Sequence, residues 1–233
     1  MRIDVIIPVL NEEARIARQI RAVSRVRGLN EIIVVDGGST DRTLAIARAH
    51  RGVSVLESPR GRAVQMNRGA RVATGDVLLF LHADVTLPGD AATWVARALG
   101  DRAVVAGAFR TFTIADGERP RFGPLLRLAD IRSRVTSLPY GDQAIFVRAA
   151  VFRCVGGFPE IPIMEDVEFC RRARRVGKIR TVPANVRVSG RRFIARPIYA
   201  TAMANVIPAL YRLGIPARFL AGLYGSVSTE EEG

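Results

Sequence analysis

Short apolar runs alternate with amphipathic segments along the first hundred residues. Uninterrupted runs of apolar and β-branched residues predict buried strands at 3–9, 31–36, 53–57 and 76–81. Between them, apolar residues recur at helical spacing, and we expect helices at about 11–27, 41–50 and 62–73. Alternating strands and helices indicate an α/β domain whose parallel strands are joined by right-handed crossovers.

The pattern continues less regularly after residue 88. We expect helices at 91–99 and 167–176 and strands at 104–113, 144–148 and 181–188, of which the strand at 104–113 could pair antiparallel. Leucines and arginines alternate within 119–138, which fits either a helix with a solvated basic face or a cover on the acceptor or membrane side.

The last apolar stretch, 196–224, is interrupted by Pro208 and Pro216 and predicts two short helices. They could dock on the core, form a dimer contact or lie on a membrane, but they are too short to span one in a single piece. A polar tail at 226–233 is expected to fray. We therefore predict a single domain over 1–225.

Polar residues with catalytic or ligand-binding chemistry follow two of the predicted strands. The run 77–81 stops at His82 and Asp84, and the strand 31–36 ends in Asp36. Open α/β sheets bind ligands at the carboxyl ends of their strands, so these side chains are candidates for a site. Both carboxylates could instead serve as turn residues, since Asp is common in turns.

The first strand is followed by Pro8–Glu12, a turn without glycine. Dinucleotide-binding domains need glycines here so that a pyrophosphate can approach the helix N-terminus. A phosphate-binding P-loop is also missing. The pattern thus argues against a dehydrogenase and a P-loop enzyme.

The net charge of the chain indicates which kinds of ligand or surface it could bind. With 35 basic and 22 acidic residues the net charge is +13, which suits phosphate-bearing ligands, an anionic membrane surface or nucleic acid. No aromatic-rich basic motif accompanies the charge, so nucleic acid is not expected. Two isolated cysteines and an amino terminus that enters a strand at once predict a cytoplasmic protein, with peripheral contact at the inner face of the membrane as an option.

Four ordered motifs together resemble the family 2 glycosyltransferases: Ile6–Glu13, Val34–Asp41, His82–Asp84 and Glu165–Asp166. The resemblance implies a GT-A fold, with a mixed, mostly parallel sheet flanked by helices. It also implies a nucleotide-sugar-binding half at 1–100, an acceptor-binding and catalytic half at 101–195, and C-terminal helices at 196–225.

Within the family, His82-Ala83-Asp84 stands where an Asp-x-Asp motif is usual. Together with Gly141–Gln143 and Ser189–Arg192, it looks like the small bacterial arsenosugar-biosynthesis-type subgroup. A subgroup does not fix an acceptor.

The resemblance also implies roles for individual residues on the donor side. Asp36 would accept a hydrogen bond from the base, typically uracil N3, which favours a UDP-sugar. Arg62 would contact phosphate, and Asn67 would lie near it or simply face solvent. The full set of implied donor-binding residues is Pro8, Leu10, Glu12, Asp36, Gly38, Arg62, Asn67, His82, Ala83, Asp84, Asp142, Gln143, Arg191 and Arg192.

A divalent cation is expected to neutralise the leaving diphosphate. Asp84 would ligate Mg²⁺ or Mn²⁺ through carboxylate oxygen. His82 could be a second ligand, a hydrogen-bond donor to phosphate or a structural histidine, and these readings stay open.

On the reaction side, the resemblance implies an inverting hexosyl transfer with Asp166 as general base and Glu165 orienting the acceptor, either a small molecule or a lipid-linked one. Asp166 could also merely cap its helix. Two rival classes remain. A nucleotidyltransferase would need a glycine-rich basic loop near the amino terminus, which is missing, and a non-catalytic binding module would tolerate Asp166→Asn.

Overall fold

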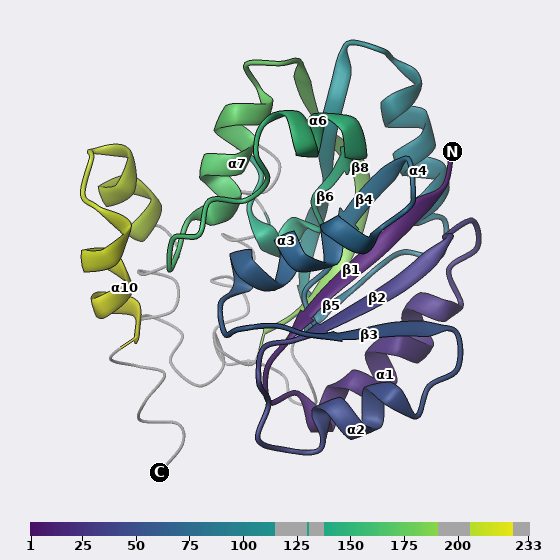
Figure 1. Ribbon diagram of the computed structural model, residues 1–233. Coiled ribbons are helices and arrows are strands. Elements are labelled where there is room, and N and C mark those ends of the chain that lie inside the picture. Colours follow the sequence, from purple (N-terminus) through teal and green to yellow (C-terminus); the bar gives the residue numbers. More distant parts are fainter. Residues whose placement is uncertain (115–129, 131–137, 191–205, 226–233) are drawn as a thin grey trace.

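The computed structural model describes residues 1–114, 130, 138–190 and 206–225, and is built on one twisted sheet (Figure 1). Within this part of the chain the strand order is β3-β2-β1-β4-β7-β6-β8-β5. The strands are β1 (Ile3–Val9), β2 (Glu31–Asp36), β3 (Val53–Glu57), β4 (Val77–Phe80), β5 (Val85–Thr86), β6 (Val104–Ile114), β7 (Phe146–Arg148) and β8 (Lys178–Ser189). The helices are α1 (Glu13–Ser24), α2 (Thr43–Arg48), α3 (Arg62–Val72), α4 (Ala91–Gly100), α6 (Ala149–Cys154), α7 (Glu165–Ala173) and α10 (Ala217–Gly225), with a 3-10 turn, η1, at Gly141–Gln143.

The amino-terminal side of the sheet matches the sequence-based prediction closely. β1, β2, β3 and β4 pair in parallel, and the bounds of the first three agree with those expected. β4 is one residue shorter at each end than predicted, and α1 ends at Ser24 rather than near residue 27. All seven residues of β1 are buried, because both faces of this central strand are covered.

The carboxyl-terminal side is mixed. β7 runs antiparallel to β4 and β6, so the expected antiparallel pairing of the 104–113 strand is confirmed, whereas β8 pairs with β6 in parallel. The sequence pattern did not predict β5 or α6. They are two and six residues long, and segments this short show no readable periodicity.

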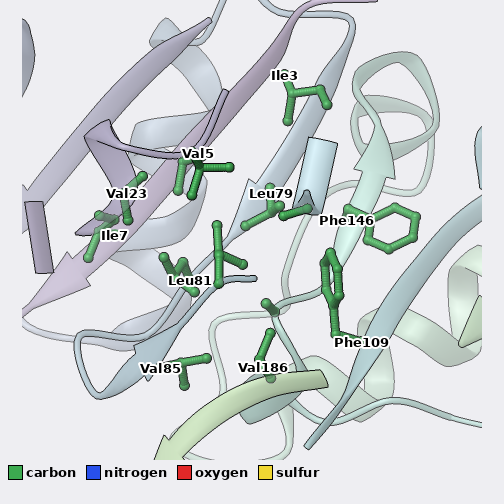
Figure 2. Packing of buried hydrophobic residues seen from close by; sticks show 14 of the residues in the cluster. Ile3, Val5, Ile7, Val23, Leu79, Leu81, Val85, Phe109, Phe146 and Val186 are labelled. Carbon is green, nitrogen blue, oxygen red and sulfur yellow. The ribbon is translucent and has the colours of Figure 1, made fainter. Parts of the chain in front are cut away.

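Two cores fill the faces of the sheet. α1, α2 and α4 cover one face, where Val5 and Ile7 lie beside Val23 of α1 and, farther along the same core, Phe146 packs beside Phe109 (Figure 2). α3, α6 and α7 cover the other face, which holds an aromatic cluster of Phe80, Phe152, Phe158 and Phe169. Ring centroids in this cluster lie 4.6–5.5 Å apart, a spacing typical of favourable aromatic contacts.

A third, smaller core attaches the C-terminal helical pair, which comprises the helical residues 206–212 and α10. Ile207 and Leu220 from this pair pack with Tyr140, Met164 and Val167. The pair stands beside α7 at the margin of the molecule (Figure 1), in agreement with docking on the core. No helix in the described ranges is both long and apolar enough to cross a membrane.

Several expectations concern residues outside the described ranges. They concern the leucine and arginine segment at 119–138, apart from residues 130 and 138, the stretch 196–205, the tail at 226–233, and Arg191 and Arg192. Their expected roles therefore stay predictions.

Candidate active site

The loops that follow β1 and β2 are tied together by hydrogen bonds. The Asn11 backbone N–H donates to Ser39 Oγ (2.9 Å), and the Thr40 N–H donates back to Asn11 Oδ1 (2.9 Å). Asn11 adopts a left-handed backbone (φ 51°), which Asn tolerates better than most residues. The Glu12 N–H donates to Thr43 Oγ1 (2.7 Å) at the start of α2. The two predicted donor-binding turns thus form one prebuilt unit.

Asp36 lies at the end of β2 and is 1% exposed. Its Oδ2 accepts hydrogen bonds from the N–H groups of Gly38 (3.0 Å) and Ser39 (2.9 Å), and its Oδ1 accepts one from Ser39 Oγ (2.5 Å). Gly38 has φ +88°, a value that favours glycine. The structure therefore shows the turn-forming role of Asp36. Oδ1 accepts one hydrogen bond and keeps a second lone pair, so a role of Asp36 in base binding stays a prediction.

Gln65 was not singled out from the sequence, yet it joins the two strand ends. Its Nε2 donates to the carbonyl oxygens of Val9 and Val35, both at 2.8 Å, and the side chain is buried. A Cβ on Gly37 would lie 2.9 Å from Gln65 Cδ, so this glycine makes room for the amide. A polar residue on an otherwise small and apolar helix face was the available signal.

His82, Gly141 and Asp166 converge at one point of the site. Asp166 Oδ2 accepts a hydrogen bond from the Gly141 N–H (2.5 Å). A Cβ on Gly141 would lie 2.7 Å from His82 Cε1, 2.8 Å from His82 Nε2 and 3.3 Å from Asp166 Oδ2. The imidazole and the carboxylate therefore both lie close to the Gly141 backbone, an approach that is possible because residue 141 lacks a side chain.

Asp166 is held at the start of α7. Its Oδ1 accepts a hydrogen bond from the Val167 N–H (2.7 Å), so both carboxylate oxygens have a backbone donor. Met164, which precedes the helix, has φ 65° and turns the chain into it. Three acidic residues occupy the first helical turn, where the helix dipole favours negative charge.

Glu165 is 1% exposed and forms an ion pair with Arg62, the first residue of α3. Its Oε2 is buried and has no hydrogen-bond partner within the part of the chain that the structure describes. Burial raises the pKa of Glu165, the charge of Asp166 raises it further, and the Arg62 guanidinium opposes both. Burial outweighs the ion pair, so this carboxyl holds its proton more tightly than an exposed glutamate.

Two amides predicted to face the donor have backbone partners. Asn67 Nδ2 donates to the Phe158 carbonyl (2.8 Å), and the Phe158 N–H donates to Asn67 Oδ1 (2.9 Å). Gln143 Nε2 donates to the Phe109 carbonyl (2.9 Å), while its Oε1 accepts from the Tyr140 N–H (3.0 Å). In this structure both amides position the loops around the site.

The other predicted donor-binding residues lie around the same edge. Pro8 is buried in β1, Leu10 is half-buried just after it, and Ala83 is buried after β4. Asp142 lies in η1 next to Gly141.

A hard divalent cation needs oxygen ligands, and half-buried Asp84 offers a carboxylate directly after β4. Among the described residues, no group of three or more His, Cys, Asp and Glu side chains could enclose a metal. Mg²⁺ and Mn²⁺ in such sites take one or two protein carboxylates and complete their shell with substrate phosphates and water. One carboxylate next to a phosphate site therefore fits this mode of binding.

The sequence is similar to a known protein family and to characterised relatives. Residues 4–154 match the family described as Glycosyl transferase family 2. A pre-mycofactocin glycosyltransferase of Mycobacterium tuberculosis is 32% identical over 191 residues, which cover 75% of this chain but 39% of that protein. A 4,4'-diaponeurosporenoate glycosyltransferase of Staphylococcus haemolyticus is 36% identical over 93 residues, covering 36% of this chain and 24% of that protein. The chain thus spans well under half the length of these relatives.

Solved structures share the fold. TarS of S. aureus in complex with UDP superposes with a TM-score of 0.65 at 21% identity, covering 81% of this chain and 60% of that one. A mannosyltransferase of Pyrobaculum calidifontis in complex with GDP-Man and Mn²⁺ gives a TM-score of 0.65 at 21% identity, covering 92% and 65%. The expected GT-A fold is thereby confirmed. Because the family match covers well over half of the chain, the protein belongs to glycosyl transferase family 2.

Proposed function

We propose that the protein transfers a sugar from a nucleotide diphosphate donor, a UDP-sugar, to an acceptor hydroxyl with inversion at the anomeric carbon. The observation that carries this proposal is the convergence of His82, Gly141 and Asp166 at the carboxyl edge of the sheet. A buried carboxylate at a helix N-terminus, close to an imidazole at the carboxyl edge of the sheet, is suited to take a proton.

In the proposed reaction, Asp166 removes the proton of the acceptor hydroxyl while that oxygen attacks the anomeric carbon. The nucleotide diphosphate leaves from the opposite face, so the configuration inverts. Backbone donors at Gly141 and Val167 keep the carboxylate oriented, since one reaches each oxygen. The remaining lone pair on each oxygen can accept the proton.

Glu165 and Arg62, which form an ion pair, are assigned different ligand contacts. The Oε2 atom of Glu165 is buried without a partner in the described residues, so a sugar or acceptor hydroxyl would satisfy it. Arg62 is exposed on its other side and is suited to meet the diphosphate as a charge-assisted donor. The hydrogen bonds that join Asn11 to Ser39 and Thr40 then hold together the two turns proposed to bind the nucleoside.

Asp84, with His82 as the second candidate, would hold a divalent cation, Mn²⁺ or Mg²⁺. Such an ion supplies charge neutralisation of the leaving diphosphate. A bound Mn²⁺ is named for the Pyrobaculum mannosyltransferase, which supports a metal of this kind here. The nucleotides named for the similar structures differ, UDP in one and GDP-Man in the other, so UDP rests on the Asp36 motif.

The acceptor is a hydroxyl on a small or lipid-linked molecule. Two free cysteines, one of them the buried Cys170, suit a reducing compartment such as the cytoplasm.

A thermal-shift screen tests the donor site. Nucleotide diphosphates and nucleotide sugars are added with and without Mn²⁺ to the wild type, to Asp84→Ala and to Asp90→Ala. Asp90 is an exposed carboxylate that accepts a hydrogen bond from Trp94 Nε1 (2.8 Å) and serves as the matched control. A ligand at 100 times its Kd stabilises by about 2.7 kcal/mol. We expect a metal-dependent shift with UDP ligands that Asp84→Ala alone removes. No shift with any nucleotide would contradict the proposal.

A further inference from the structure

The positive charge of this protein is concentrated in one part of the chain. No Asp or Glu occurs between Glu168 and Glu230, whereas twelve of the 35 basic residues lie there. This stretch therefore carries nearly the whole net charge of +13. It includes the last turn of α7, β8 and the C-terminal helical pair (residues 206–225).

The same helical pair exposes large apolar side chains. Leu213 is 81% exposed and Phe219 60%, the two highest values among the exposed large hydrophobic residues, and Val206 is 42% exposed. Leu213 lies in the turn between the two helices and Phe219 in the first turn of α10. Exposed apolar groups gathered on one element indicate a contact surface.

Arginines accompany these apolar groups. Arg212 and Arg218 are both exposed, and the Arg218 guanidinium lies 5.0 Å from the centroid of the Phe219 ring. Apolar side chains interleaved with arginines, without a carboxylate nearby in sequence, match the composition of interfacial membrane-binding helices. A second copy of this chain would bring an equally cationic surface, which the charge disfavours.

The opposite side of the helical pair faces the candidate active site. Ile207 and Leu220 pack against Tyr140 and Met164, which directly precede η1 and α7. Arg212 also reaches the Tyr140 hydroxyl, at 3.5 Å. A surface that binds the outer side of the pair would therefore lie next to the part of the site assigned to the acceptor.

We propose that the C-terminal helical pair binds the surface of an anionic lipid bilayer, with Leu213 and Phe219 inserted at the interface and Arg218 contacting lipid phosphates. Neither the apolar side chains nor the arginine side chains are expected to hold the protein on the bilayer alone. Peripheral binding of this kind combines burial of apolar groups with attraction to anionic headgroups. The inference does not depend on the proposed sugar transfer.

Vesicle co-sedimentation tests the inference with the full chain. The probes are vesicles of phosphatidylcholine alone and vesicles that also contain phosphatidylglycerol. The wild type should bind the anionic vesicles and not the neutral ones, and binding should weaken as salt is raised. Leu213→Glu and Phe219→Glu should each weaken binding on the order of tenfold or more, since each removes apolar insertion and adds a negative charge.

Val72→Glu is the matched control, because Val72 is a similarly exposed apolar residue (47%) on α3, outside the helical pair. It should bind like the wild type, and all three variants should keep the wild-type melting temperature. Four outcomes would overturn the inference. They are no binding to anionic vesicles, equal binding to neutral ones, wild-type binding by both glutamate variants, and a dimer in light scattering that Leu213→Glu dissociates.

Discussion

The two halves of the candidate site are built differently. On the donor side, hydrogen bonds of Asn11, Ser39 and Thr40 join the turns after β1 and β2, and Gln65 links the strand ends beneath them. On the reaction side, Asp166 meets Gly141 across 25 residues of sequence, and Glu165 meets Arg62 across 103. On the donor side the buried Asp36 carboxylate accepts three hydrogen bonds from its own turn, whereas the reaction side places two buried carboxyl groups, Glu165 and Asp166, next to each other.

This difference suggests that substitutions in one half of the site can reduce its function without affecting the other half. The hydrogen-bond network on the donor side fixes the shape of the two turns, and its loss should lower stability and nucleotide affinity together. Asp166 and His82 lie so close to Gly141 that little volume can be added between them. A change there should reduce turnover first.

The largest effect is expected from Gly141→Ala. The added Cβ would come within 2.8 Å of both His82 ring atoms nearest to it and within 3.3 Å of Asp166 Oδ2, so at least one group must move. Displacement of a catalytic group by about 1 Å can cost 10²-fold in rate. We expect turnover of a nucleotide sugar to fall on that order, with nucleotide affinity by calorimetry unchanged.

Gly89→Ala is the control, since a Cβ there has no neighbour within 4 Å and the residue does not have a positive φ. It should keep wild-type turnover. Equal turnover in both variants would mean that the space beside Asp166 is not used.

Gln65→Leu tests the donor side. The change removes the amide donor of the Val9 and Val35 carbonyl oxygens, of which Val9 keeps the Gly37 N–H (2.9 Å), so we expect a loss of about 0.5–1.5 kcal/mol per hydrogen bond. Urea unfolding should show this loss, and UDP affinity should fall with it. Arg68→Leu on the exposed face of α3 should change stability by no more than about 0.5 kcal/mol. A stable Gln65→Leu protein with normal UDP affinity would contradict the role of this amide.

The smallest effect concerns the pH dependence of stability. The pKa of Glu165 is raised in the folded protein, mainly by burial, above its ordinary value of 4.5. The folded state therefore binds this proton more tightly than the unfolded state. Its contribution to stability is fully present below pH 4.5 and is lost as pH rises through the raised pKa.

Glu165→Gln should lack this loss, so its free energy of unfolding should fall less than that of the wild type over the same pH range. Glu57→Gln, at an exposed carboxylate paired with Arg48, should follow the wild-type curve. Identical curves for Glu165→Gln and the wild type would show that this carboxyl does not titrate differently on folding.

The donor side could be predicted from sequence because its signals are local. Strands, turns and helices follow one another within some 20 residues, so Asp36 and the Asn11 turn were placed at the correct edge. Gln65 escaped notice because its partners are backbone carbonyls on two strands, and no local pattern marks them. The bounds of β1 to β3 agreed for the same local reason.

The reaction side could not be derived in this way. Which loop contacts Asp166 depends on how β7 reverses direction beside β4, and the sequence pattern does not encode that reversal. The pairing of Arg62 with Glu165 likewise follows from α3 and α7 sharing one face of the sheet. Family resemblance named Asp166 and Glu165, but only the fold showed that Gly141 allows His82 and Asp166 to approach each other.

The most direct test of the account compares Asp166→Asn with the wild type. Calorimetry measures the affinity for the nucleotide sugar, and release of the nucleotide diphosphate with water as acceptor measures turnover. A general base typically contributes 10²–10⁴-fold, so we predict a loss of about that size with little change in affinity. Turnover within a few-fold of the wild type, at equal affinity, would show that Asp166 is not the base.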